Sequence, residues 1–162
     1  MTTSNDAAQS MSARIDYAQV APEALKAMRG VENYVHGGVI ESGLLELVKF
    51  RASQINGCAF CIDMHTKDAR ASGETEQRLY ALTAWRETPF FTQRERAALA
   101  WTEAVTLVAD GHVPDEVYEL ARANFNEREL VDLTMAVVAI NGWNRLAISF
   151  RKVPGTYQTK PH

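Results

Sequence analysis

Apolar side chains recur every three or four positions along most of this chain, a spacing that places them on one face of an α-helix. In "GLLELVKFRASQI" (43–55), for example, the leucines and Val48 form an apolar stripe beside Glu46. Neither a convincing alternating pattern, which predicts a strand, nor an Asn-Gly turn between two β-rich runs occurs in the sequence. The pattern therefore predicts an all-α fold of six or seven helices.

Residues that start and stop helices set the expected boundaries. Ser42 is expected to cap one helix. Two capping boxes, Thr92 with Glu95 and Asn126 with Glu129, each open another helix. The helices are expected within residues 22–36, 43–55, 58–72, 74–85, 93–109, 114–125 and 127–150.

Length and composition predict one domain without a nucleic-acid or membrane partner. The chain has 162 residues and a net charge of −3, which is too acidic for a surface that follows phosphates. No run approaches the roughly 18 apolar residues of a membrane span. Residues 1–12 are small, polar and unpatterned, so we expect a flexible tail there and a single helical domain over 13–162.

The N-terminus lacks the basic and apolar regions of a secretory signal, which predicts a cytoplasmic protein. The chain has two cysteines. Because structural disulfides are rare in the cytoplasm, a pair of cysteines there is expected to be redox-active or metal-binding.

Cys58 and Cys61 are three residues apart, and His65 follows four residues later. On one helix, positions i, i+3 and i+7 share a face. The pair is expected at the helix N-terminus, where the dipole favours a thiolate, and the two side chains can also close a disulfide. His65 can exchange a proton with Cys61, and Glu46 can orient His65 if the chain folds back after Asn56-Gly57.

Other interpretations of these residues remain open. The cysteines can be small core residues, or Cys58, Cys61, His65 and Glu46 can bind a metal ion, although zinc sites more often bring a second Cys/His pair. The pair can also serve as a redox sensor. The dipole favours Cys58 as the attacking thiol, whereas the position of His65 favours Cys61.

The sequence resembles the AhpD-type alkyl hydroperoxidases of the carboxymuconolactone decarboxylase-like superfamily. The resemblance rests on Glu46, on "RASQINGC", and on Cys58-x-x-Cys61-x-x-x-His65. It implies an all-helical fold and homo-oligomers, often trimers or hexamers. It also implies an organic hydroperoxide as substrate and an external dithiol reductant, either lipoylated or thioredoxin-like. An enzyme of this kind requires no haem, flavin or metal cofactor.

The same resemblance implies a role for each site residue. Cys61 is the peroxidatic thiol that becomes a sulfenic acid, Cys58 resolves it to a disulfide, and Glu46 and His65 relay protons. Phe60 stands where well-studied members carry a histidine, which leaves room for a dithiol–disulfide reductase with little peroxidase turnover. Members of the decarboxylase branch generally lack the redox cysteine pair, so the intact pair argues against that reaction.

Overall fold

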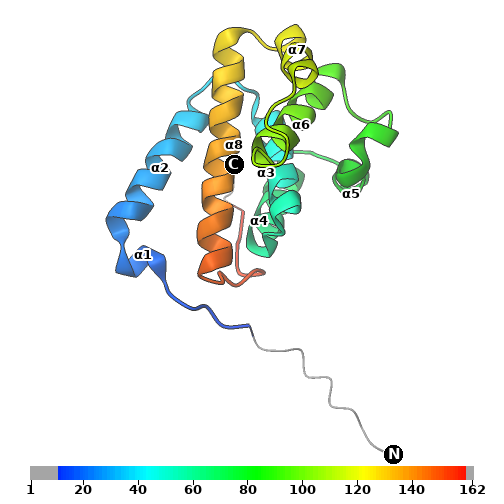
Figure 1. The fold of residues 1–162 in the computed structure, drawn as a ribbon. Coiled ribbons are helices and arrows are strands. Elements are labelled where there is room, and N and C mark those ends of the chain that lie inside the picture. The colour runs from blue at the N-terminus through cyan, green and yellow to red at the C-terminus, as the bar shows by residue number, and fades with distance from the viewer. Residues whose placement is uncertain (1–10, 160–162) are drawn as a thin grey trace, which may run out of the picture.

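A computed structural model describes residues 11–159, and all the regular structure in this part of the chain is helical (Figure 1). The helices are α1 (Tyr17–Val20), α2 (Pro22–His36), α3 (Ser42–Asn56), α4 (Ala59–Ala71), α5 (Glu76–Ala81), the 3₁₀-helix η1 (Leu82–Glu87), α6 (Gln93–Thr106), α7 (Asp115–Asn124) and α8 (Glu127–Ser149). The predicted all-α fold is confirmed. Of the predicted 1–12 tail, residues 1–10 lie outside the described residues, as do residues 160–162 at the other end.

The number of helices in the described residues is larger than the six or seven predicted. One addition is α1, a single turn too short to show an apolar period. The other arises because the segment predicted as one helix over 74–85 divides into α5 and η1, within which Ala84 has non-helical backbone angles. The six helices of ten residues or more are α2, α3, α4, α6, α7 and α8, and all of them were predicted.

Both capping boxes are present, with side chain and backbone paired in each direction at Thr92–Glu95 and at Asn126–Glu129. The prediction that Ser42 caps α3 is wrong. Ser42 is already the first residue of the helix, because Glu41 before it has the extended backbone (φ −59°, ψ 136°) that the capping position takes. The Glu41 side chain is engaged elsewhere, since it binds the guanidinium of Arg94 on α6.

Helix α3 lies at the centre of the fold and packs against α4, α6 and α8. Apolar residues on several of its sides are buried, so it has no wide solvent face; these include Leu44, Leu45, Leu47, Val48, Phe50 and Ala52. Helix α8 runs the height of the molecule and also packs against α2 (Figure 1). Because burying each large apolar side chain contributes about 1.5–3 kcal/mol, this arrangement fixes the helix that precedes the cysteines.

A left-handed glycine turns the chain from α3 into α4. Gly57 has φ +67°, which a residue with a Cβ rarely adopts, and the N–H of Cys58 donates to the carbonyl of Ser53 at 3.0 Å. The turn lets α4 fold back along α3, with Cys58 as its N-cap residue. The predicted placement of the cysteine pair at a helix N-terminus is confirmed.

After α8 the chain returns along α4. The N–H of Gly155 donates to Asp63 at 3.0 Å, and Lys67 donates to the carbonyl of Tyr157 at 3.1 Å. These contacts hold the segment 150–159 beside the cysteine-bearing helix. No helix within residues 11–159 is both long and apolar enough to cross a bilayer.

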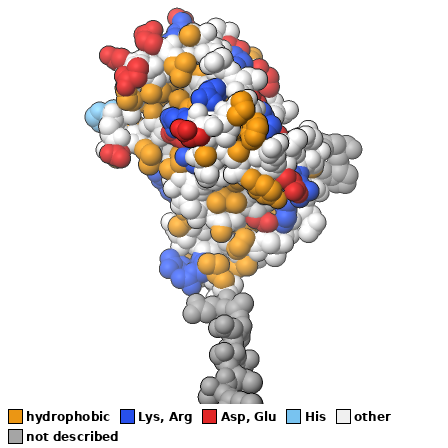
Figure 2. All heavy atoms as spheres, turned by 90° about the vertical axis from the view of Figure 1, so that its right-hand side faces the viewer, with side chains coloured by type: hydrophobic (Ala, Val, Ile, Leu, Met, Phe, Trp, Pro, Cys, Tyr) orange, Lys and Arg blue, Asp and Glu red, His pale blue; other side chains and the backbone are white. Residues whose placement is uncertain are grey.

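Exposed hydrophobic side chains lie between acidic and basic ones on the face of the molecule shown in Figure 2. Charges of both signs are mixed on that face. It therefore lacks the continuous basic field that phosphate-binding surfaces present.

Candidate active site

The two cysteine sulfurs lie 2.7 Å apart and are both buried, each residue being 1% exposed. Cys58 is the N-cap residue of α4, and Cys61 lies in its first turn. Both cysteines are free thiols in the structure. Their sulfurs are close enough to share a proton, and a small movement can join them in a disulfide.

The environment of the pair favours one thiolate. Contact with the Cys61 sulfur, assisted by the backbone N–H groups of Cys61 and Phe60 and by the Asn144 amide, lowers the pKa of Cys58 to about 7 against the opposing effect of burial. The contact with Cys58, burial and the Cys58 charge raise the pKa of Cys61. Cys58 therefore ionises first, as its position at the positive end of the helix dipole predicts, and Cys61 keeps the proton.

Glu46 and His65 are in contact, an arrangement that the sequence permitted. Nδ1 of His65 and Oε2 of Glu46 are 2.8 Å apart, and His65 is only 5% exposed. Burial opposes ionisation of Glu46, but the hydrogen bond and charge of His65, with Lys49 behind them, hold its pKa below the usual value. An ionised Glu46 fixes the orientation of the imidazole.

Asp68 and Tyr157 extend this group of polar side chains. The Tyr157 hydroxyl donates to the Asp68 carboxylate at 2.8 Å, and burial together with this bond raises the pKa of Tyr157 to about 12. Ligand atoms of Glu46, His65 and Asp68 lie within 4.8 Å of one another, a group that could hold a metal ion. Among the described residues the cysteines do not join that group, so the four-ligand set of Cys58, Cys61, His65 and Glu46 is not assembled.

The sequence marks Asn144 only as a candidate pocket residue, and the structure places it beside the cysteines. It is fully buried on α8, where its amide donates to Ser53 at 3.0 Å and accepts from Asn56 at 2.8 Å. Its amide also lowers the pKa of both cysteines. The only local signal was its place in "NGWNR", an unusual polar sequence in the middle of a helix.

A cavity of about 500 Å³ opens onto Cys61 and His65. Its wall includes Glu46, Asp68 and Tyr157, and apolar side chains such as Leu25, Met64 and Trp143. The volume lies in the range of small-molecule sites, and the mostly apolar wall with a few converging polar groups is typical of them.

A second ionic group lines the same cavity away from the sulfurs. Lys49, 1% exposed, binds the carboxylate of Glu32, which also accepts from Nε1 of Trp143 at 3.0 Å and from His36 at 3.0 Å. Burial opposes ionisation of Glu32, but Lys49, Trp143 and His36 together keep its pKa low. The buried ammonium is therefore paired, and its charge is neutralised locally.

Phe60 packs under a cation from the C-terminal segment. Nζ of Lys152 lies 4.3 Å from the centre of the Phe60 ring and 5.8 Å from that of Tyr17. Its positive charge favours ionisation of Cys61. A charged group therefore stands next to the cysteine pair, supplied by a residue far away in the sequence.

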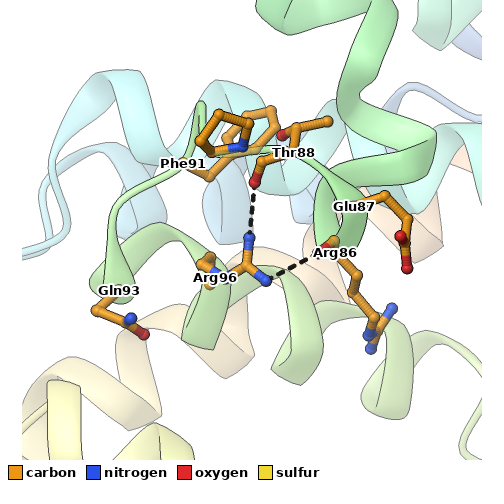
Figure 3. A pocket seen from close by; sticks show the side chains of 7 residues that line it. Arg86, Glu87, Thr88, Phe91, Gln93 and Arg96 are labelled. Atoms are coloured by element: carbon orange, nitrogen blue, oxygen red, sulfur yellow. Dashed lines mark hydrogen bonds between the residues drawn. The ribbon is translucent and has the colours of Figure 1, made fainter.

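A hollow of about 520 Å³ between η1 and α6 contains none of the predicted residues (Figure 3). Arg96, which lines it, donates to the backbone carbonyls of Trp85, Thr88 and Arg86. This arginine holds the loop before α6 in place.

The chain belongs to the carboxymuconolactone decarboxylase family, whose sequence pattern matches residues 22–104. It is 48% identical to the uncharacterized protein YdfG of Bacillus subtilis (strain 168) over 139 residues, which cover 86% of this chain and 95% of that protein.

Solved structures share the fold. ATU0492 of Agrobacterium tumefaciens, a protein of unknown function with the suggested name antioxidant defence protein AhpD, is 46% identical, with a TM-score of 0.87 over 90% of this chain and 100% of that one. The debrominase Bmp8, solved in complex with 2,3,4-tribromopyrrole, is 16% identical, with a TM-score of 0.77 over 85% of this chain and 74% of that one. At that identity the likeness to Bmp8 concerns the fold alone. The family match and the ATU0492 structure confirm the resemblance to AhpD-type proteins.

Proposed function

We propose that this protein is a cysteine-based peroxidase that reduces organic hydroperoxides through a Cys58–Cys61 dithiol/disulfide cycle. The observation that carries the proposal is the pair of sulfurs 2.7 Å apart, with Cys61 on the wall of a cavity that also contains the His65–Glu46 pair. Substrate, thiol and proton relay are thus expected to meet in one partly apolar space.

The first step uses the shared proton of the sulfurs. The Cys58 thiolate takes the proton of Cys61, and the Cys61 sulfur attacks the terminal oxygen of the hydroperoxide, the one that carries the hydrogen. The O–O bond breaks, Cys61 becomes a sulfenic acid, and the alkoxide that leaves takes a proton from His65, which Glu46 keeps oriented. Cys58 then attacks the sulfenic acid, which releases water and leaves the disulfide.

The cycle closes when an external dithiol reduces the disulfide. Over one turnover the hydroperoxide and the dithiol become an alcohol, water and a new disulfide, so two electrons pass from the dithiol to the peroxide. The 2.7 Å contact supports Cys58 as the resolving thiol, and the cavity supports Cys61 as the thiol that meets the substrate.

The test is consumption of cumene hydroperoxide by the purified protein with dihydrolipoamide as reductant. Steady turnover is expected, and it is expected to vanish in the Cys61→Ser variant. In the Cys58→Ser variant a sulfenic acid is expected to persist on Cys61 and to be seen as a dimedone mass shift.

Two results contradict the proposal. Turnover that survives in Cys61→Ser removes the role given to Cys61. Formation of the disulfide without any turnover contradicts the peroxidase and indicates a reductase or a redox sensor instead.

A further inference from the structure

The two sulfurs face two different openings of the molecule. Cys61 lines the larger cavity, whereas Cys58 lines a separate one of about 180 Å³ together with its neighbours Gly57 and Ala59. The wall between the two openings contains Phe60, Ala147 and Lys152, because these three residues line both. A molecule in the smaller opening therefore meets Cys58 without passing the hydroperoxide cavity.

The lining of the smaller opening is mostly apolar, and its charged residues are both basic. Met11, Ile148 and Pro154 contribute apolar surface, and Arg151 and Lys152 are the charged residues of its lining. Neither cation forms an ion pair with an acidic side chain in the part of the chain that the structure describes. In the larger cavity, by contrast, Lys49 is neutralised by Glu32.

The backbone at Arg151, one of the two basic residues of this lining, is unusual. Arg151 has φ +53° where α8 ends, and the N–H of Lys152 donates to the carbonyl of Ala147 at 2.8 Å. This is the helix ending in which glycine is normally found, since other residues are strained there. An arginine at that position costs stability and places a cation beside the opening over Cys58, which agrees with a site for a negatively charged ligand.

We propose that the smaller opening is the docking site of the reductant, and that it takes a slender dithiol carrying a negative charge. This inference rests on the proposed peroxidase cycle and deepens it. A volume of 180 Å³ is below the roughly 300–1,000 Å³ of pockets that enclose a drug-sized ligand. Such a space suits an extended aliphatic arm and excludes the folded active-site loop of a thioredoxin-like protein.

The chemistry of reduction is a double exchange. A thiolate of the docked dithiol attacks the Cys58 sulfur, the Cys58–Cys61 bond breaks, and Cys61 leaves as a thiolate that takes a proton from His65. The second thiol of the donor then gives its proton to His65, attacks the mixed disulfide and releases Cys58 as a thiolate. The donor leaves oxidised to a disulfide, and the enzyme has gained two electrons and one proton, which returns it to the Cys58 thiolate and Cys61 thiol.

The test compares two reductants that differ only in charge. The protein is first oxidised with diamide, so that no hydroperoxide is involved, and its reduction by dihydrolipoate and by dihydrolipoamide is followed at low ionic strength. The anionic dithiol is expected to react about fivefold faster, since one favourable contact at the surface changes a rate by roughly that factor. The ratio is expected to fall to about twofold in Arg151→Gly, where Lys152 still carries a charge, and to about one in Arg151→Glu, where the two charges cancel.

A matched control reverses a charge elsewhere. Lys26→Glu alters an exposed cation on α2 and is expected to keep the ratio of the unmodified chain. Equal rates with both dithiols in the unmodified protein, or an unchanged ratio in Arg151→Glu, overturn the proposal. If a thioredoxin reduces the protein as fast as dihydrolipoate does, the proposal that the opening takes only a slender dithiol is overturned.

Failure of the peroxidase gives a different result. In that case the diamide-formed disulfide is still reduced with the expected preference, but no hydroperoxide is consumed. The two proposals can therefore fail separately.

Discussion

The ionisation of the cysteine pair can be tested by changing Asn144 to alanine. The pKa of Cys58 is about 7, so Cys58 is a thiolate in half of the molecules at pH 7. This thiolate fraction rises at higher pH and falls at lower pH. The Cys61 sulfur makes the larger contribution to stabilising this thiolate, and the Asn144 amide makes a smaller one. A hydrogen bond to a charged group contributes about 1.5–3 kcal/mol, and the lower value applies here because the amide is one of several donors.

A loss of about 1.4 kcal/mol corresponds to about one pH unit. The midpoint is therefore expected near pH 8 in Asn144→Ala, and the thiolate fraction at pH 7 is expected to fall about fivefold. The measurement is thiolate absorbance at 240 nm as a function of pH, which does not depend on reagent access to the buried sulfurs. Asn144→Asp, which puts a negative charge beside the pair, is expected to raise the midpoint further.

Ser53→Ala is the matched control, because it removes the hydroxyl that Asn144 contacts but leaves the amide beside the sulfurs. Its midpoint is expected to stay near 7. If Asn144→Ala titrates like the unmodified protein, or if Ser53→Ala shifts as much, the amide does not tune the thiols and the reasoning is refuted.

Three further substitutions test other parts of the site. Glu46→Gln removes the charge that orients His65 and is expected to lower kcat/KM for cumene hydroperoxide about 10²-fold; an unchanged value contradicts the relay. Lys49→Met leaves the Glu32 carboxylate without its buried cation and is expected to lower the free energy of unfolding in urea by about 3 kcal/mol. Adding Glu32→Gln is expected to recover part of this loss, whereas additive effects of the two substitutions contradict the ion pair. Tyr157→Phe removes the hydroxyl bond that ties the C-terminal segment to α4 and is expected to cost about 1 kcal/mol. Because the pKa of Tyr157 is about 12, the pH profile of activity below pH 10 is expected to stay the same in that variant, and a shifted profile indicates a proton-transfer role instead.

The sequence by itself determined the features that depend on neighbours within one helical turn. Both capping boxes formed as predicted, because their hydrogen bonds join residues three positions apart. The placement of Cys58 and Cys61 at a helix start followed from the Asn56-Gly57 break and from their spacing. The apolar periodicity likewise predicted each of the longer helices.

The meeting of Glu46 with His65 was an expectation that needed the tertiary structure to decide it. The turn at Gly57 permits contact between α3 and α4, but the packing of these helices sets the 2.8 Å distance between the side chains. Local rules failed where a longer-range contact competed with them. Ser42 does not cap α3, because Glu41 occupies the capping position while binding Arg94 across the fold.

The remaining site residues were decided by the tertiary structure alone. Asn144, Lys152 and Tyr157 lie more than 80 positions beyond Cys61 in the chain, and each reaches the site only because α8 packs against α3 and α4 and the chain then turns back along α4. Apart from the unusual "NGWNR" around Asn144, no periodicity or spacing marks these residues in the sequence. The effect of Asn144 and Lys152 on the thiols arises from distance, burial and charge, which exist only after the helices have packed.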